Sequence, residues 1–195
     1  MGRPSQTNVV PNWDALYEVA APQDGYFSAA QAREVGYSLP LLQYYLGRGR
    51  LQRAARGIFR LVHFPAGEHE DLVVLWLWSG REGVLSHETA LALHELSDAM
   101  PATRHITVPS AWEQRRVKVP DGVELHFANV PASQTEWVGA VPVTAPLRTI
   151  EDCVAEHVSP EWIEQAARQG VERGLFSSAA VKKARGRKSV KARST

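Results

Sequence analysis

The residues of this sequence with the clearest chemistry are basic, and they lie in one short stretch. Between Arg48 and Arg60 there are five arginines and no acidic residue. Such a local excess suits a polyanion, because neutralised phosphates release their counterions and the planar guanidinium fork matches phosphate oxygens and guanine edges. The stretch is therefore predicted to contact nucleic acid. A solvated domain edge or a protein-docking surface is the alternative.

The segment ahead of the arginines predicts two short helices. Ser28 and Gln31 form a capping-box pattern, which indicates a helix that starts at Ala29 and that Gly36 ends. Ser38 should cap a second helix, with a proline in its first turn. Apolar residues occupy the core-facing positions of this second helix, namely Leu39, Leu42, Tyr45 and Leu46.

Two extended runs, 51–54 and 58–61, follow and meet around Arg56 and Gly57. With the two helices they predict a winged helix-turn-helix, in which the second helix enters a DNA major groove and the hairpin is the wing. A helix over 13–21 should pack behind both as scaffold. The predicted DNA-binding residues are Ser38, Gln43, Tyr44, Arg48, Arg50, Arg53 and Arg56.

Composition indicates a globular chain of two domains. Of the 195 residues, 44% are hydrophobic and 22% charged, which is ordinary for a protein that buries a core. The predicted fold class is α+β, with a winged helix-turn-helix over residues 1–62 and a mixed α/β domain over 63–181. Residues 182–195 are expected to form a basic flexible tail.

Charge is distributed unevenly along the chain. Residues 1–62 carry seven arginines and four acids, a net charge of +3, whereas 63–181 carry −9 and 182–195 carry +7. At least one basic end is therefore expected to meet a polyanion. In the tail, the predicted phosphate contacts are Lys182, Lys183, Arg185, Arg187 and Lys188.

The larger domain shows alternating helix and strand signals. Helices are predicted over 68–78, after Ser86 as cap through residue 96, from Pro146, from Ser159-Pro160 and after Ser177. Strands are predicted over Ile106–Val108, Val117–Val119, Val123–Val130 and Val141–Thr144. The domain should therefore be mixed α and β.

Cysteine usage and hydropathy indicate the compartment. Cys153 is the single cysteine, so no disulfide within the chain is possible and a reducing compartment is expected. No apolar run approaches the roughly 20 residues of a membrane helix, and the N-terminus lacks the apolar segment of a signal peptide. The predicted location is the cytoplasm, without a membrane partner.

A few polar groups in the larger domain could do other chemistry. Ser86, His87 and Glu88 have the types of a nucleophile, a base and an acid, but neighbours on one helix point about 100° apart, so a capping role for Ser86 is favoured. His87 and His94 could share a helix face as metal ligands, and Arg148 with Asp152 is interpreted as a surface ion pair. No catalytic residue, metal site or cofactor is predicted.

The order of motifs resembles one family. The helix-turn-helix running into LQRAARGIFRL, then GVLSHETALALHEL, HITVP and VPVTAPLRTIEDC, is similar to AbiEi-family antitoxins, which are regulators of type IV toxin–antitoxin systems. The resemblance covers about residues 13–157. It implies a partner toxin of nucleotidyltransferase type and repression of the protein's own operon through inverted repeats in promoter DNA. It also assigns the DNA contacts to Gln43, Tyr44, Arg48, Arg53 and Arg56.

Two other readings of the function remain open. The protein could be an enzyme that neutralises its toxin by covalent modification, or a winged-helix transcriptional regulator with no toxin. Enzyme activity is the minority hypothesis, because no phosphate-cradling loop or kinase signature is present. Neutralisation by docking and by competition for nucleic acid are not distinguished by the sequence.

Overall fold

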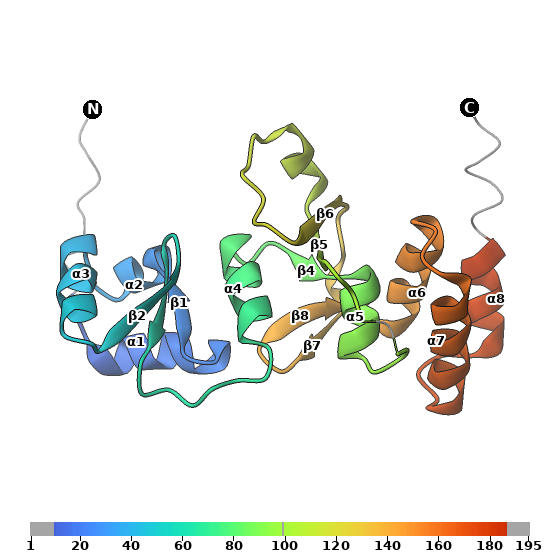
Figure 1. The fold of residues 1–195 in the computed structure, drawn as a ribbon, viewed down its shortest axis with the longest axis horizontal. Helices are drawn as coiled ribbons and strands as arrows, with labels where there is room; N and C mark the ends of the chain where they lie inside the picture. The colour runs from blue at the N-terminus through green and yellow to red at the C-terminus, as the bar shows by residue number, and fades with distance from the viewer. Residues whose placement is uncertain (1–9, 99, 187–195) are drawn as a thin grey trace. The chain divides into compact units, whose positions relative to one another are not determined.

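The computed structural model describes residues 10–98 and 100–186, which belong to two compact units that divide between Arg81 and Glu82 (Figure 1). Both units combine helices with a sheet, so the predicted α+β class is confirmed. Among the described residues, no helix is long and apolar enough to cross a bilayer.

The first unit is a small antiparallel sheet surrounded by helices. Its elements are α1 (Trp13–Ala20), the 3-10 turn η1 (Ala21–Gln23), β1 (Tyr26–Ser28), α2 (Ala29–Glu34), α3 (Leu39–Gly47), β2 (Leu51–Ala55), β3 (Ile58–Leu61) and α4 (Glu70–Trp78). The strand order is β1-β3-β2, with both pairings antiparallel.

The two predicted helices and their caps are confirmed. Gln31 N donates to Ser28 Oγ at 3.2 Å and Ser28 N donates to Gln31 Oε1 at 2.9 Å, which completes the capping box of α2. Gly36 follows the end of α2 at a φ of 89°, a conformation that glycine adopts without steric cost. Ser38 Oγ accepts from Leu41 N at 3.4 Å and caps α3.

The predicted hairpin is confirmed as well. β2 and β3 pair antiparallel, Gly57 turns the chain at a φ of 76°, and a bulge lies between Arg53 and Ala55. β1 was not predicted, because three residues are too short for an alternating pattern. It pairs with β3 and closes the other edge of the sheet.

A compact core holds the helices of this unit against its sheet. Its buried members are Leu16, Ala20, Phe27, Ala32, Tyr37, Leu42, Leu51, Phe59 and Leu61. The prediction that Leu39 faces this core is wrong, since its side chain is 50% exposed. Leu39 is the first residue of α3 and lies beyond the turn that Leu42 anchors.

The first unit is longer than the predicted domain. The sequence suggested a boundary after residue 62, whereas the unit continues through α4 to Arg81. α4 packs on β1 and β3, and Arg60 Nη2 on β3 lies 2.9 Å from Glu70 Oε1 on α4. These contacts join residues that are apart in the sequence. They could therefore not be predicted from the Pro- and Gly-containing segment after β3.

The second unit is a five-stranded mixed sheet with helices. Its strands are β4 (Val84–Leu85), β5 (Arg104–Val108), β6 (Val123–Phe127), β7 (Thr135–Val138) and β8 (Val141–Thr144), in the order β6-β5-β4-β8-β7. Its helices are α5 (His87–Leu93), α6 (Pro146–Ala155), α7 (Pro160–Glu172) and α8 (Ser178–Gly186), with 3-10 turns η2 (Ser110–Gln114) and η3 (Ala132–Gln134). β4 pairs parallel with β8, and β5 pairs parallel with β6.

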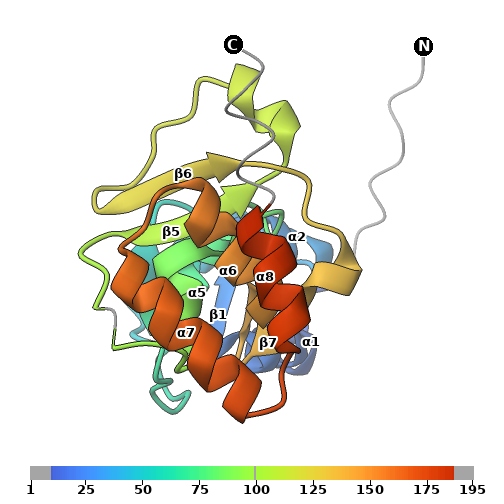
Figure 2. The ribbon, with the colours of Figure 1, turned by 90° about the vertical axis from the view of Figure 1, so that its right-hand side faces the viewer.

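Figure 2 shows α7 and α8 side by side, and both pack against α6. The buried residues shared by these helices and α5 are Leu91, Leu96, Ile150, Cys153, Val154, Ile163, Ala166, Ala167 and Val181. On α7, Ile163 and Ala166 are buried and face these neighbours. Ser177 caps the last helix as predicted, because its Oγ accepts from Ala180 N at 3.2 Å.

Several predicted bounds in this unit are wrong. The strand expected over 117–119 is irregular backbone, and exposed residues surround it. β6 ends at Phe127 because its neighbour β5 ends opposite, at Val108. α5 ends at Leu93, since Glu95 takes a left-handed φ of 52° and Leu96 N turns back to Leu91 O. The short strands β4 and β7 were not predicted.

Candidate nucleic-acid interface

The exposed face of α3 carries polar and aromatic side chains. Leu42 is fully buried and fixes the rotation of the helix, so that Gln43 and Tyr44 are exposed. Arg48 caps the C-terminal end, with its guanidinium carbon 5.2 Å from the centre of the Tyr44 ring. An amide, a phenol and a guanidinium are thus presented by three residues of one helix. These groups can donate to phosphates or to base edges.

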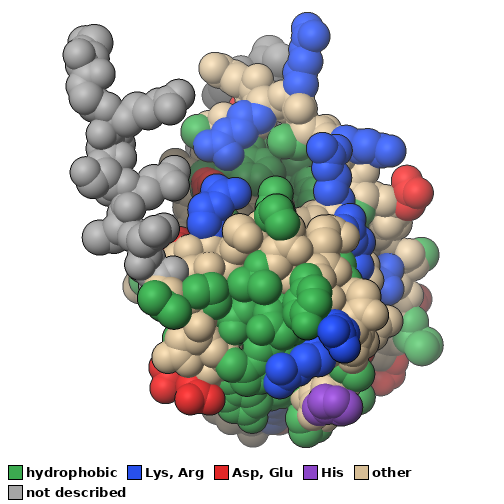
Figure 3. Space-filling model, turned by 90° about the vertical axis from the view of Figure 1, so that its left-hand side faces the viewer, with side chains coloured by type: hydrophobic (Ala, Val, Ile, Leu, Met, Phe, Trp, Pro, Cys, Tyr) green, Lys and Arg blue, Asp and Glu red, His purple; other side chains and the backbone are tan. Residues whose placement is uncertain are grey.

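The β2–β3 hairpin continues this surface, because β2 packs beside α3. Arg53 is exposed on β2, and its guanidinium carbon lies 5.7 Å from the centre of the Phe59 ring. Arg56 is exposed at the turn between the strands. In Figure 3, which faces the side where α3 lies, arginine side chains of this unit adjoin exposed hydrophobic ones.

Arg50 is held more firmly than the other exposed arginines. Its guanidinium carbon lies 4.2 Å from the centre of the Trp13 ring and 5.7 Å from that of Tyr45. Cation–π contact orients a guanidinium while leaving its N–H groups free at the edge. The Arg50 guanidinium is therefore already oriented before any ligand binds. The same contact links α1 to the segment after α3.

Ser38, one of the predicted DNA contacts, and Arg60, the last arginine of the basic stretch, have structural roles. Ser38 is exposed, yet its hydroxyl caps α3. Arg60, the fifth arginine of the stretch, is occupied: besides Glu70 it donates to Phe64 O at 3.0 Å and to Pro65 O at 3.2 Å. With 14% of its side chain exposed, Arg60 is a structural residue. Four of the five arginines in the stretch therefore remain available to contact a polyanion.

A buried glutamine pair fixes the start of α2. Gln31 Nε2 donates to Gln23 Oε1 at 2.9 Å, and Gln23 Nε2 donates to Val19 O at 2.8 Å and to Tyr26 O at 3.0 Å. Both side chains are at most 5% exposed. The network joins α1, β1 and α2. Only the capping bonds between Ser28 and Gln31 could be predicted from the sequence.

The basic residues near the C-terminus are partly helical. Lys182, Lys183 and Arg185 are exposed on α8, which continues to Gly186, so these three do not belong to a flexible tail. The remaining predicted contacts, Arg187 and Lys188, lie outside the described residues.

The Ser86-His87-Glu88 segment differs from its prediction. Ser86 stands at the N-cap of α5, but its hydroxyl makes no cap bond; it lies 2.9 Å from His87 Nδ1 and accepts from Thr107 Oγ1 at 2.8 Å. The reason is the left-handed φ of 52° at His87, which turns the two neighbouring side chains together. Glu88 instead contacts His105, so the three residues form no relay.

The predicted ion pair between Arg148 and Asp152 forms, but not at the surface. Arg148 Nε donates to Asp152 Oδ1 at 2.7 Å, but the side chains are only 18% and 14% exposed, so the pair is largely buried. Burial is the main cause that raises the pKa of Asp152, against the hydrogen bond from Arg148. His94 Nε2 lies 2.8 Å from Thr144 O, which makes it a structural residue apart from His87.

Comparison with known proteins gives little further information. The sequence matches no family model and no curated protein. One solved structure that the chain matches is the crystal structure of the RV2827C protein from Mycobacterium tuberculosis. The match has a TM-score of 0.43 and 13% identical residues, and it covers 94% of this chain and 84% of that chain.

Proposed function

We propose that the protein binds double-stranded DNA through residues 13–61, acting as a winged helix-turn-helix in which α3 enters the major groove and the β2–β3 hairpin is the wing. The observation that supports this most is the exposed polar face of α3 next to the hairpin arginines. An α-helix fits the major groove in width, and arginines on an adjoining hairpin can reach the flanking phosphates.

The charge and rigidity of the region support the same function. Arg48, Arg53 and Arg56 are exposed and have no acidic partner among the described ion pairs. The helix that carries the readout is fixed by Leu42 and by its Ser38 cap, so little conformational entropy remains to be lost on binding. A protein-docking surface would need fewer cations around Tyr44.

The wider proposal is an antitoxin that represses its own operon in the cytoplasm. Its partners are inverted repeats in its promoter and a nucleotidyltransferase-like toxin. This part rests on the resemblance of the sequence to AbiEi-family antitoxins. We assign DNA binding to the first unit and toxin neutralisation to the second.

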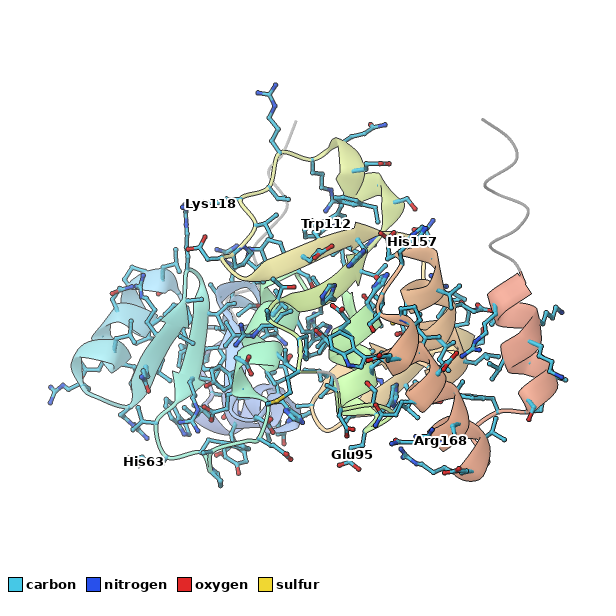
Figure 4. The ribbon with its side chains drawn as sticks, turned by 45° about the vertical axis from the view of Figure 1, so that its right-hand side comes forward. His63, Glu95, Trp112, Lys118, His157 and Arg168 are labelled. Carbon is cyan, nitrogen blue, oxygen red and sulfur yellow. The ribbon has the colours of Figure 1, made fainter. Side chains whose placement is uncertain are left out.

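A fluorescence anisotropy titration tests the DNA proposal. Labelled DNA from upstream of the gene is compared with a shuffled duplex of equal length over a series of salt concentrations. The Arg53→Ala/Arg56→Ala variant should lower the slope of log affinity against log salt by about one per lost phosphate contact. Arg168→Ala, an exposed arginine on α7 (Figure 4), is the matched control and should keep the slope. Equal affinity of the wild type for both duplexes would refute the regulator.

The toxin proposal needs a separate test. The nucleotidyltransferase-like toxin is co-expressed with the whole chain or with residues 82–195, and growth is measured. Rescue by both would assign neutralisation to the second unit, and mass spectrometry of the rescued toxin would detect a covalent modification. Absence of rescue by the whole chain would leave a transcriptional regulator without a toxin.

A further inference from the structure

Three histidines come together in the second unit, whereas the proposed DNA interface belongs to the first. His87 is the first residue of α5, His105 lies on β5 and His126 on β6. One ring nitrogen from each lies within 4.8 Å of the other two. His87 and His105 are each 5% exposed, whereas His126 is half-buried, so the group can be reached from the side of His126.

The hydrogen bonds of His105 indicate which of its nitrogens carries the proton and which one faces the other histidines. His105 Nε2 lies 2.6 Å from Glu88 Oε2 and 3.2 Å from Thr103 Oγ1. An ionised carboxylate only accepts hydrogen bonds, so the proton of His105 is on Nε2 and the lone pair is on Nδ1. Nδ1 faces His126 Nε2 at 3.1 Å. A carboxylate behind a histidine in this way is the usual outer shell of a metal-binding imidazole.

His87 has the same division of its two nitrogens. Nδ1 lies beside Ser86 Oγ, which leaves Nε2 as the nitrogen without a hydrogen-bond partner among the described contacts. A metal ion would bind this Nε2 through its lone pair, because only an unprotonated ring nitrogen can be a ligand.

The backbone conformation at His87 and the close packing of the three rings are unusual for residues that only fill a core. A φ of 52° is uncommon for a residue other than glycine, and such strain gathers at functional sites. The His87 and His126 rings stack with centroids 3.7 Å apart, and the His105 and His126 centroids are 5.4 Å apart. Three polar imidazole rings, with no apolar side chain between those of His87 and His126, are an energetically unfavourable way to fill a core.

We propose that His87, His105 and His126 bind one divalent transition-metal ion of the zinc class, with Glu88 as the outer-shell carboxylate that orients His105. Imidazole is a ligand such ions favour, and three histidines leave a fourth position for water. Metal–nitrogen distances of about 2.0–2.1 Å in a tetrahedron place ligand nitrogens roughly 3.3 Å apart. One pair of nitrogens in the cluster is 3.1 Å apart and all three lie within 4.8 Å of one another, so small movements of the rings would bring them to tetrahedral spacing around one ion.

The test uses the full-length protein without a polyhistidine tag, stripped of metal with a chelator and titrated with Co²⁺. The wild type should bind about one equivalent and develop the visible absorption of four-coordinate cobalt, and Zn²⁺ should abolish that absorption. His126→Ala, chosen because the residue is half-buried and tolerates truncation, should bind at least about tenfold more weakly. Circular dichroism confirms that the variant is folded.

Two further variants make the assignment specific. His63→Ala, on the segment between β3 and α4 of the first unit (Figure 4), should titrate like the wild type. Glu88→Gln should keep the stoichiometry but weaken binding by about 10- to 100-fold, as expected for an outer-shell carboxylate. Wild-type protein without the cobalt absorption, or a folded His126→Ala with wild-type affinity, would overturn the site. Unchanged affinity of Glu88→Gln would overturn the positioning role alone.

Discussion

Gln43 is the side chain on α3 best suited to reading a base. It is exposed one position after the buried Leu42, and a glutamine amide can bind N6 and N7 of adenine at once. The neighbouring side chains of Tyr44 and Arg48 contact each other. We therefore expect them to bind phosphates of the DNA backbone rather than base edges. Sequence readout and phosphate binding are therefore separable by residue.

Replacing Gln43 with alanine should reduce specificity more than affinity. The loss of a bidentate pair removes about 1–3 kcal/mol of discrimination against a wrong base, whereas binding to random DNA rests on the arginines. Anisotropy with upstream and shuffled duplexes measures both quantities. Gln114→Ala, an exposed glutamine on η2 in the other unit, should leave both unchanged. A uniform loss on both duplexes would show that Gln43 contacts only the backbone.

Cys153 should be unreactive while the protein is folded. Burial, followed by the nearby Asp152 and Glu88 charges, raises the pKa of its thiol, so the nucleophilic thiolate is scarce. Alkylation by iodoacetamide near pH 8 should be at least about tenfold slower than in guanidinium chloride. Because the folded pKa is raised, Cys153 contributes stability below its ordinary pKa of 9.0 and loses it as the pH rises further. Equal alkylation rates in both states would contradict the buried position.

At the scale of elements, the orientation of α2 relative to α1 and β1 depends on the buried Gln23–Gln31 pair. Gln23→Leu would remove two donors to backbone carbonyls and leave the Gln31 amide without its acceptor. Unsatisfied buried groups of this kind cost about 1–3 kcal/mol. Urea unfolding should show this loss, whereas Gln52→Leu on the exposed side of β2 should change stability by less than about 0.5 kcal/mol. Similar values for the two variants would mean that water replaces the network.

At the scale of the whole molecule, the end of the first unit can be tested by truncation. A fragment of residues 1–81 keeps α4 and the Arg60–Glu70 pair, whereas one of residues 1–62 leaves Arg60 without its carboxylate and uncovers β1 and β3. Thermal unfolding followed by circular dichroism should be cooperative for the longer fragment and at a clearly lower temperature, or absent, for the shorter. If the shorter fragment melted at the same temperature, α4 would be dispensable.

The C-terminal charges can be removed without shortening α8. Residues 187–195 contain four Lys and Arg residues and no acid, so they can add phosphate contacts that do not depend on sequence. Their deletion should weaken binding to upstream and shuffled DNA by similar factors and lower the salt slope by up to about one per removed charge. Unchanged binding, together with loss of toxin rescue, would assign these residues to the protein partner instead.

Local chemistry in the sequence determined the parts of the first unit that present the proposed DNA contacts. The Ser28–Gln31 capping box, the Ser38 cap and the Gly57 turn act over a few residues, so their effects could be predicted from spacing alone. The exposure of Gln43 and Tyr44 follows from the helical period once Leu42 faces inward. The Cys153 position in the core of α5–α8 follows in the same way from the apolar side of α6.

Only the tertiary structure decided what distant residues do to one another. Arg60 belongs by sequence to the same basic stretch as Arg48–Arg56, but it pairs with Glu70, ten residues later. His87, His105 and His126 are separated by loops and meet only because β5 and β6 pair and α5 lies against β5. The left-handed backbone at His87 could not be predicted from the sequence either, since no turn residue stands there. Such contacts are invisible to local patterns because sequence spacing carries no record of which strands become neighbours.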